Sequence, residues 1–196
     1  MRKELVFLLE EESAKALLET LLPRLLDPSI QPRLIPFEGK QDLEKRMAGK
    51  LRGYLNPQAC FIVMRDQDST PDCHTIKTRL LAKCAEAGRE SVTLVRIACR
   101  ALETFYLADL EAVGKALVIR HLSGQQGSAK FRAPDYMESP DQELGKLSNH
   151  AYQKVRDSRL LGNLLDLTNT RSSSFVNLLG AIKRMERELL ALSDEE

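Results

Sequence analysis

The first hundred residues alternate short apolar runs with amphipathic helical stretches, and this alternation constrains the fold more than any other feature. Apolar runs occupy residues 5–9, 60–64 and 92–97, and a weaker run at 33–37 contains Pro36. A continuous apolar run is typical of a strand that is buried on both faces. Because Pro36 cannot donate a ladder hydrogen bond, we expect the second strand to end there or to lie at the edge of the sheet.

Helical patterns separate these runs. A leucine stripe follows Ser13, which we expect to cap its helix, and further helices are predicted over 40–53, 72–87 and 100–108. Asp72 is expected to cap the helix at 72–87. An alternation of strands and helices implies right-handed crossovers and a parallel sheet with helices on its faces. The sequence therefore predicts an α/β fold.

The second half of the chain is less regular. Residues 121–142 contain glycines, prolines and polar residues with few apolar ones, which is typical of a long loop. Helical spacing returns from residue 143, and an apolar stripe runs through 174–192. We therefore expect an α/β core at 1–120, a loop excursion at 121–142 and a helical C-terminal extension at 143–196 that packs on the core.

Composition and charge exclude several classes of protein. No apolar run approaches the ~20 residues of a membrane span, and the first residues lack a signal-peptide core, so we expect a cytoplasmic protein without a membrane partner. The chain has 29 Lys and Arg against 28 Asp and Glu, so any nucleic-acid surface must be local. The four cysteines have no C-x-x-C spacing, which favours reduced thiols over a zinc site. The glycine motifs for ATP and NAD binding are absent.

Carboxylates follow three of the predicted strands. Glu10 comes directly after the first strand, Asp66 and Asp68 follow the third, and Glu103 lies shortly beyond the fourth. Since the carboxyl ends of parallel strands share one edge of a sheet, we expect these groups to converge. Carboxylate oxygens are the ligands that Mg²⁺ prefers, and a bound metal activates water beside a phosphoryl group. We predict that Glu10, Asp66 and Asp68 hold Mg²⁺ or Mn²⁺. Glu103 is either a further ligand, a water-orienting base or a surface acid.

Basic residues near this edge are candidates for phosphate binding. Arg96 and Arg100 either bind a phosphate or neutralise the carboxylates. Lys130 lies in the loop excursion, which is either a solvated loop or a contact to a nucleic-acid backbone. Strand alternation predicts that Arg65 faces away from the neighbouring Asp66.

The order of these acids resembles the Toprim domain of topoisomerases, primases and the overcoming-lysogenization-defect (OLD) nucleases. The resemblance implies that Glu10, Asp66 and Asp68 bind Mg²⁺ for phosphodiester chemistry. Residues 6–10, 64–68, 96–109 and 173–175 resemble more closely a bacterial Toprim-like family. Its members are commonly encoded beside AAA or ABC-type ATPases and are associated with phage defence.

Two positions depart from the pattern of that family. Glu11 stands where glycine is usual, and Ala14 stands where a second acid is usual. A lost glycine affects how closely the turn approaches a phosphate, and a lost acid removes a ligand or a helix cap.

The sequence thus favours a metal-dependent Toprim-type nuclease that acts in phage defence or DNA processing. Its predicted catalytic residues are Glu10, Asp66, Asp68 and Glu103. An alternative is a non-catalytic or partner-activated subunit of an ATPase complex that docks through residues 143–192. A third alternative is a phospho-acceptor or a small-molecule binder that uses the same acidic edge.

Overall fold

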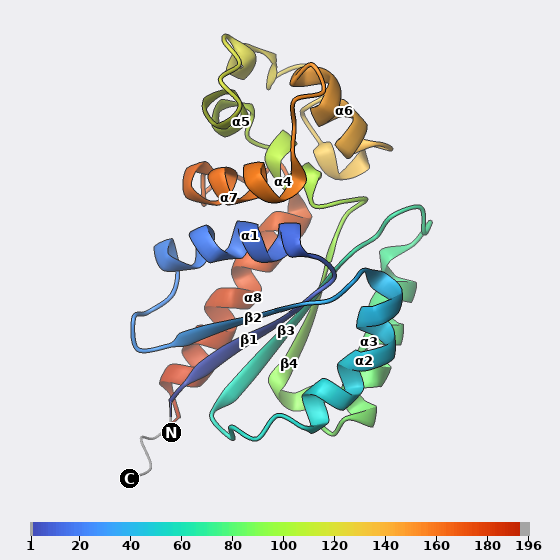
Figure 1. The fold of residues 1–196 in the computed structure, drawn as a ribbon, viewed down its shortest axis with the longest axis vertical. Coiled ribbons are helices and arrows are strands. Elements are labelled where there is room, and N and C mark those ends of the chain that lie inside the picture. Colours follow the sequence, from blue (N-terminus) through green and yellow to red (C-terminus); the bar gives the residue numbers. More distant parts are fainter. Residues whose placement is uncertain (1, 193–196) are drawn as a thin grey trace.

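Four parallel strands form one sheet in the computed structural model, which describes residues 2–192 (Figure 1). The strand order is β2-β1-β3-β4, and neighbouring strands run in the same direction. The strands are β1 (Glu4–Leu9), β2 (Gln31–Pro36), β3 (Ala59–Asp66) and β4 (Thr93–Ala98). The α/β fold with a parallel sheet is therefore confirmed.

The ends of the strands follow from their residues. β2 ends at Pro36 and pairs only with β1, so the proline lies at the edge of the sheet as predicted. β3 is longer than its apolar run, because Asp66 still pairs in register with Ala98 of β4. This extension places a carboxylate inside the last pair of the ladder.

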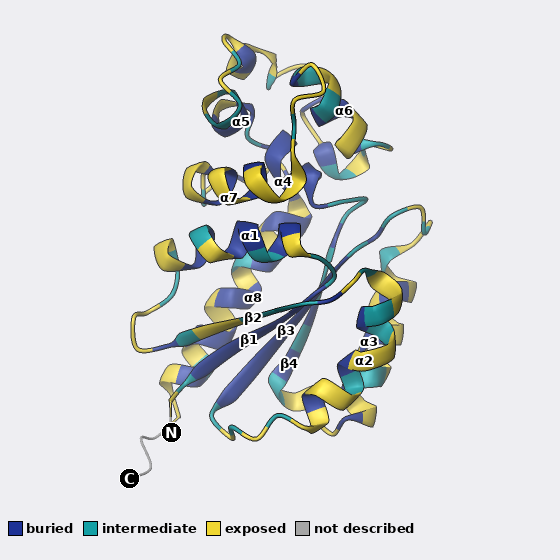
Figure 2. Cartoon of the chain, viewed as in Figure 1, coloured by how far each residue is buried: buried dark blue, intermediate teal, exposed yellow. Residues whose placement is uncertain are grey.

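Helices cover both faces of the sheet. α2 (Lys40–Arg52) and α3 (Cys73–Glu86) lie on one face, and α1 (Glu12–Leu21) and α8 (Ser173–Leu190) lie on the other (Figure 1). Side chains of β1 alternate between two apolar clusters, as a period of two requires. The strands are buried along most of their length, and the helices expose only their outer sides (Figure 2). The sheet is thus a two-sided core.

A group of short helices lies above the carboxyl edge of the sheet (Figure 1). It contains α4 (Glu103–Leu107), α5 (Leu110–Ala116), α6 (Pro140–Leu147) and α7 (Lys154–Leu164). Four short 3-10 turns complete the elements: η1 (Leu22–Arg24), η2 (Glu90–Val92), η3 (Leu122–Gln125) and η4 (Pro134–Tyr136).

α7 packs closely along α1, and a glycine makes this approach possible. A Cβ atom on Gly162 would lie 2.2 Å from Thr20 Oγ1 and 2.4 Å from the Leu17 carbonyl oxygen. Any larger residue would force the two helices apart. The contact carries the beginning of α7 toward the residues that follow β1.

Two helix starts differ from the sequence-based expectation. Glu11, not Ser13, occupies the N-cap of α1, and the Ser13 hydroxyl donates a hydrogen bond of 2.6 Å to Glu11 Oε1. The helix predicted from residue 100 begins at Glu103, because Arg100 adopts a left-handed conformation with φ 65°. Asp72 caps α3 as predicted, since its carboxylate accepts the backbone N–H groups of the first turn.

The segment 121–142 contains two 3-10 turns and the first residues of α6. The start of α8 is fixed beside η4, because Asp135 accepts hydrogen bonds from Ser172 and Ser174. Phe175 packs on Phe105 with ring centroids 5.1 Å apart. Among residues 2–192, no helix has the length and apolar character needed to cross a membrane.

Candidate metal centre

Glu10 and Asp66 flank the point where the chain connections of the sheet change direction. The helix that follows β1 covers one face, and the helix that follows β3 covers the other (Figure 1). In open parallel sheets, ligands bind in the crevice at such a switch point. Glu10 Oε2 accepts a hydrogen bond of 3.0 Å from the backbone N–H of Asp66. The sheet thus brings the first two predicted ligands together.

The carboxyl groups at this point are crowded by their own charges. Burial and the carboxylates of Glu10 and Glu103 raise the pKa of Asp66 well above its ordinary value, although a hydrogen bond from Leu102 N–H opposes this shift. Burial raises the pKa of Glu10 as well, and the charge of Asp68 adds to the effect. Both shifts thus come first from burial, and the neighbouring carboxylates add to them.

Asp68 stands on a turn just beyond the sheet. Its backbone is left-handed with φ 56°, and its N–H donates a hydrogen bond of 2.8 Å to the carbonyl oxygen of Arg100. Its carboxylate pairs with Lys40 Nζ at 2.9 Å and lies 3.6 Å from Arg65 Nη2. The loops that follow β3 and β4 are therefore joined beyond the ends of their strands.

Arg65 is a buried cation beside the acids. Its side chain is 4% exposed, forms an ion pair with Glu44, and has its Nε 3.7 Å from Glu10 Oε2. It therefore pairs with Glu10, Glu44 and Asp68 rather than with Asp66, its neighbour in the strand. Arg65 offsets part of the negative charge from the α2 side of the sheet.

Glu103 is fully buried. Its Oε1 accepts a hydrogen bond of 3.1 Å from the Tyr152 hydroxyl and lies 3.9 Å from Lys154 Nζ. Its Oε2 has no hydrogen-bond partner among the residues that the structure describes. Burial raises the pKa of Glu103, and the charge of Lys154 opposes this shift. One oxygen of Glu103 is therefore held, and the other is left for a further group.

Lys154 also binds the residue that follows Glu10. Its Nζ lies 2.9 Å from Glu11 Oε1. Glu11 itself has φ −152°, an extended conformation that any residue adopts, so a glycine is not required there. The acid at this position thus serves as a partner for α7.

The acids open on a shared cavity of about 220 Å³, which we call the acidic cavity. Asp66, Asp68 and Glu103 line it together with Arg100 and Lys154. Glu10 is not among its lining residues but adjoins one of them, since it accepts the backbone N–H of Asp66. The structure thus brings Glu10, Asp66, Asp68 and Glu103 to one edge of the sheet.

A tighter cluster of ligand atoms lies elsewhere. Within residues 2–192, one group of three His, Cys, Asp or Glu residues has ligand atoms that all lie within 4.8 Å of one another, and it consists of Asp72, Cys73 and His74. The carboxylates at the acidic cavity are more widely spaced than this group. Two lysines act as counter-charges here, since Lys40 pairs with Asp68 and Lys154 pairs with Glu11.

The three predicted phosphate-binding residues lie in different places. Arg100 lines the acidic cavity. Arg96 donates a hydrogen bond of 2.9 Å to the Asn177 carbonyl oxygen and lines a separate cavity of about 280 Å³. Lys130 forms an ion pair with Glu143 and lies over the Phe131 ring. Only Arg100 is thus adjacent to the acids.

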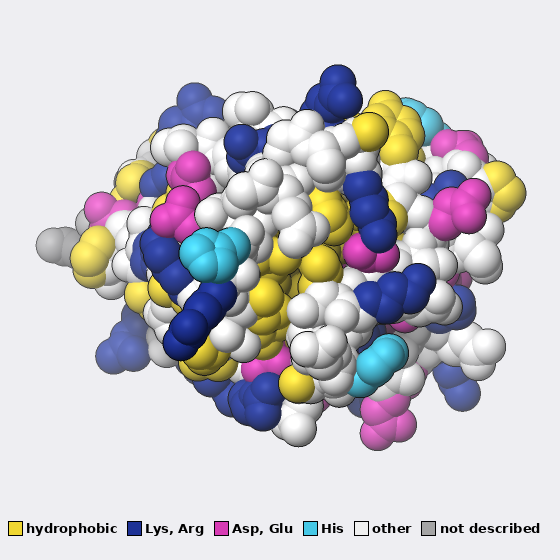
Figure 3. All heavy atoms as spheres, turned by 90° about the horizontal axis from the view of Figure 1, so that it is seen from above, with side chains coloured by type: hydrophobic (Ala, Val, Ile, Leu, Met, Phe, Trp, Pro, Cys, Tyr) yellow, Lys and Arg dark blue, Asp and Glu magenta, His cyan; other side chains and the backbone are white. Residues whose placement is uncertain are grey.

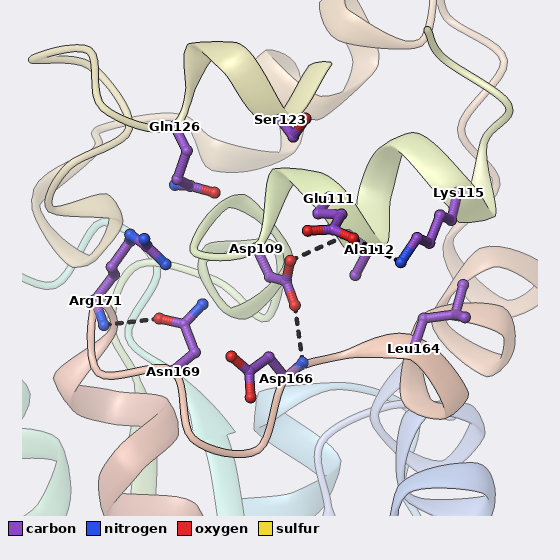
Figure 4. Close-up of a pocket in the computed structure, with 10 residues that line it drawn as sticks. All are labelled: Asp109, Glu111, Ala112, Lys115, Ser123, Gln126, Leu164, Asp166, Asn169 and Arg171. Atoms are coloured by element: carbon purple, nitrogen blue, oxygen red, sulfur yellow. Dashed lines mark hydrogen bonds and ion pairs between the residues drawn. The ribbon is translucent and has the colours of Figure 1, made fainter. Parts of the chain in front are cut away.

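Another cavity, of about 460 Å³, lies between α5 and the segment after α7 (Figure 4). Asp109 caps α5 there and accepts a hydrogen bond of 2.8 Å from the backbone N–H of Asp166. Asn169 Oδ1 accepts the backbone N–H of Arg171. These hydrogen bonds connect the start of α5 with the segment that follows α7.

The surface around the upper helices carries mixed charge. Seen from above, Lys and Arg side chains lie among Asp and Glu side chains, with hydrophobic side chains between them (Figure 3). No continuous basic face is visible from this side. An anionic ligand on this face would therefore be bound by a few local cations.

A family model described as "Domain of unknown function (DUF4276)" matches residues 9–183. The chain belongs to the DUF4276 family. Among the curated proteins, none matches this DUF4276 chain. A solved structure, the C-terminal region of the Burkholderia pseudomallei OLD protein, is similar with a TM-score of 0.53 and 16% identity. The alignment covers 96% of this chain and 99% of that one, so the two share a fold over nearly their whole length.

The residues of this DUF4276 chain fit a divalent cation by their chemistry. The acidic cavity offers carboxylate oxygens, which are the donors that Mg²⁺ and Mn²⁺ prefer. Glu103 adds a buried oxygen that has no hydrogen-bond partner within residues 2–192, and the pKa of Asp66 is raised by burial and then by the nearby carboxylates of Glu10 and Glu103. Both features are those of a site that lacks positive charge.

Four side chains of the DUF4276 site were not predicted from the sequence: Lys40, Arg65, Tyr152 and Lys154. Tyr152 and Lys154 are far from the acids along the chain and reach them only because α7 packs on α1. No spacing or motif marks them. Arg65 had one signal, because a charged residue inside an otherwise apolar strand requires buried partners.

Proposed function

We propose that this protein hydrolyses phosphodiester bonds in nucleic acid and depends on Mg²⁺ or Mn²⁺. The observation that carries the proposal is the contact between Glu10 and Asp66 at the switch point, with Asp68 and Glu103 opening on the same cavity as Asp66. The fold shared with the OLD C-terminal region supports it, as does the resemblance of the acidic motifs to Toprim domains.

Glu10, Asp66 and Asp68 are the proposed ligands of the cation. When bound, such a cation supplies an acidified water and stabilises charge on a phosphoryl oxygen. The carboxylates gain from the bound charge, because burial and then their mutual repulsion disfavour their ionised forms. Lys40 and Arg65 neutralise Asp68 until then.

The other residues of the acidic cavity bind the substrate and handle protons. Arg100 and Lys154 present cations where a phosphate would enter. Tyr152 holds one oxygen of Glu103, so the buried Oε2 has a defined position and is the candidate proton acceptor for a water admitted to it. Burial raises the pKa of Glu103 from its ordinary value, which makes its carboxylate a stronger base near neutral pH.

Incubation of purified protein with plasmid, linear DNA and RNA in Mg²⁺ or Mn²⁺ tests the proposal. Asp66→Asn and Glu10→Gln should each lower cleavage by about 100-fold or more. Glu111→Gln is the matched control, because this acid is exposed and pairs with Lys115 in the next turn. Cleavage that survives the double variant Asp66→Ala, Asp68→Ala would show that the site is wrongly assigned.

A second candidate function is that of a subunit activated by an ATPase partner. α7 and α8 leave five large apolar side chains exposed, which are Val155, Leu160, Leu164, Val176 and Leu190. Co-expression with an ATPase encoded beside this chain, followed by nuclease assays of each protein alone and of both together, tests this candidate. Full activity of the isolated chain would rule it out. A role in phage defence rests on the resemblance alone and is tested by plaque counts with and without Asp66→Asn.

A further inference from the structure

A second cavity of about 460 Å³, which we call the side cavity, adjoins the acidic cavity. It lies between α6 and the segment that leads into α7, and its own walls are Gln142, Gly145, Lys146, His150 and Tyr152. Its volume falls in the range of about 300–1,000 Å³ that is typical of small-molecule sites. It is therefore large enough for a flat organic group.

The two cavities share three lining residues, which are Glu103, Asp141 and Lys154. The two cavities are thus adjacent, and a ligand that has its phosphate beside Asp66 can extend toward the side cavity. Lys154 stands at this junction, and its Nζ is held by Glu11 at 2.9 Å.

The free oxygen of Glu103 is an independent sign of a ligand. The side chain is fully buried, lines both cavities and has no partner for Oε2 among residues 2–192. Buried polar atoms almost always have a hydrogen-bond partner, so an orphan at a cavity wall indicates a group that is absent here. Its Oε1 is fixed by Tyr152, so Oε2 cannot turn away to find another donor without breaking that bond.

The walls of the side cavity have the chemistry that recognises a nucleobase. His150 and Tyr152 line the cavity with rings of the kind on which bases stack, and the Gln142 amide has both a donor and an acceptor. His150 is held in place by its backbone, which has φ 62° and donates a hydrogen bond of 2.7 Å to the Gly145 carbonyl oxygen. Lys146 adds a cation near the opening.

Gly145 keeps this space open. A Cβ atom on Gly145 would meet only His150 Nδ1, at 3.8 Å, which is ordinary contact. A larger side chain there is tolerated by the helix and would project toward the residues that line the cavity. Gly145 therefore offers a way to fill the side cavity without touching the acids.

We infer that the side cavity holds the base of a nucleotide that flanks the phosphodiester in the acidic cavity. This inference rests on the proposed function and narrows its substrate to strands in which a base is free to leave the stack, such as single strands, frayed ends and loops. A paired and stacked duplex interior would be a poor substrate.

A binding experiment tests the inference without any need for cleavage. Adenosine monophosphate and inorganic phosphate are titrated into the protein by calorimetry, without divalent ions. The wild-type protein should bind the nucleotide about 5-fold or more tightly than phosphate, and Gly145→Phe should lose this difference. Equal affinities in the wild-type protein would overturn the side cavity as a base site. His150→Asn, which retains a residue suited to a left-handed backbone, serves as the second variant if Gly145→Phe does not fold.

Cleavage of two matched single-stranded oligonucleotides, one intact and one with an abasic position, tests whether the bound base belongs to the substrate strand or to a free nucleotide. The wild-type protein should cleave the intact strand about 5-fold or more faster at that position, and Gly145→Phe should bring the ratio near one. Nucleotide binding with equal cleavage of both strands would assign the cavity to a free nucleotide and overturn the inference. If neither strand is cleaved while the nucleotide binds, the proposed nuclease function fails. The side cavity would then bind a base but would not be part of a substrate site, which overturns the inference.

Discussion

Asp66→Asn should stabilise the protein in the absence of divalent ions, and the gain should grow as the pH rises. The carboxyl of Asp66 is raised in pKa by burial, and then by Glu10 and Glu103. A raised folded-state pKa means that the folded protein binds the proton more tightly than the unfolded chain does. The stabilising contribution of this carboxyl is then fully present below its unfolded-state pKa of about 3.9, and it is lost as the pH rises through the folded-state pKa. The asparagine variant has no such loss.

The size of the gain follows from the charges that are removed. Two carboxylates about 6 Å apart repel by ~0.7 kcal/mol in water and by ~3 kcal/mol at an effective dielectric constant of 20. The asparagine oxygen still accepts the Leu102 N–H, which is the one backbone hydrogen bond to this side chain that the structure gives. We therefore expect a net gain of about 1–3 kcal/mol at alkaline pH, or roughly 2–10 °C in Tm for a chain of this length.

Thermal and urea unfolding in a chelator, from about pH 5 to about pH 9, measures this effect. Glu111→Gln is the control, since it removes an exposed acid of the same charge. Added Mg²⁺ or Mn²⁺ should stabilise the wild-type protein, by about 2.7 kcal/mol at 100 times its Kd, and should leave the Asp66→Asn variant nearly unchanged. A variant that is less stable than the wild-type protein at alkaline pH would refute the reasoning, because the carboxylate would then be satisfied where it stands.

Three further predictions concern the parts that support the site. Phe105→Ala should lower the free energy of unfolding by about 3–5 kcal/mol in urea titrations, because it empties the contact with Phe175. Ser172→Ala should lower it by about 0.5–2 kcal/mol, since α8 loses the side chain that accepts the Phe175 N–H, and Ser172→Asn should restore most of the loss. Lys154→Met should lower the free energy of unfolding by about 0.5–1 kcal/mol at alkaline pH and by less at acidic pH. The reason is that the charge of Lys154 lowers the pKa of Glu103, so its removal destabilises the ionised form of that carboxyl. Equal losses at both ends of the pH range would contradict this.

The sheet could be predicted from the sequence because a strand that is buried on both faces is recognisable as a continuous apolar run. Continuous apolar runs and Pro36 were enough to predict a parallel sheet and its edge strand. The meeting of Glu10 with Asp66 follows from the same pattern, since neighbouring parallel strands end side by side. The metal itself stays a prediction.

Other parts of the site could not be predicted, because they depend on packing between distant segments. Tyr152 and Lys154 reach Glu103 only through the contact of α7 with α1, which Gly162 permits. The start of α4 was placed too early, since nothing in the residues around Arg100 marks a left-handed turn. The spacing of apolar residues along a helix shows which face of the helix is buried, but not which other helix covers that face.

The position of α8 determines when the fold can be completed during synthesis. This helix, Ser173–Leu190, packs against β4, β3 and β1, so part of the sheet face that it shares with α1 stays uncovered until the ribosome has translated most of the chain. At typical elongation rates the interval from β1 to α8 is roughly ten to thirty seconds, during which an apolar sheet face is exposed to chaperones. A prematurely terminated product would lack this cover and would be a substrate for proteolysis rather than a partially working protein.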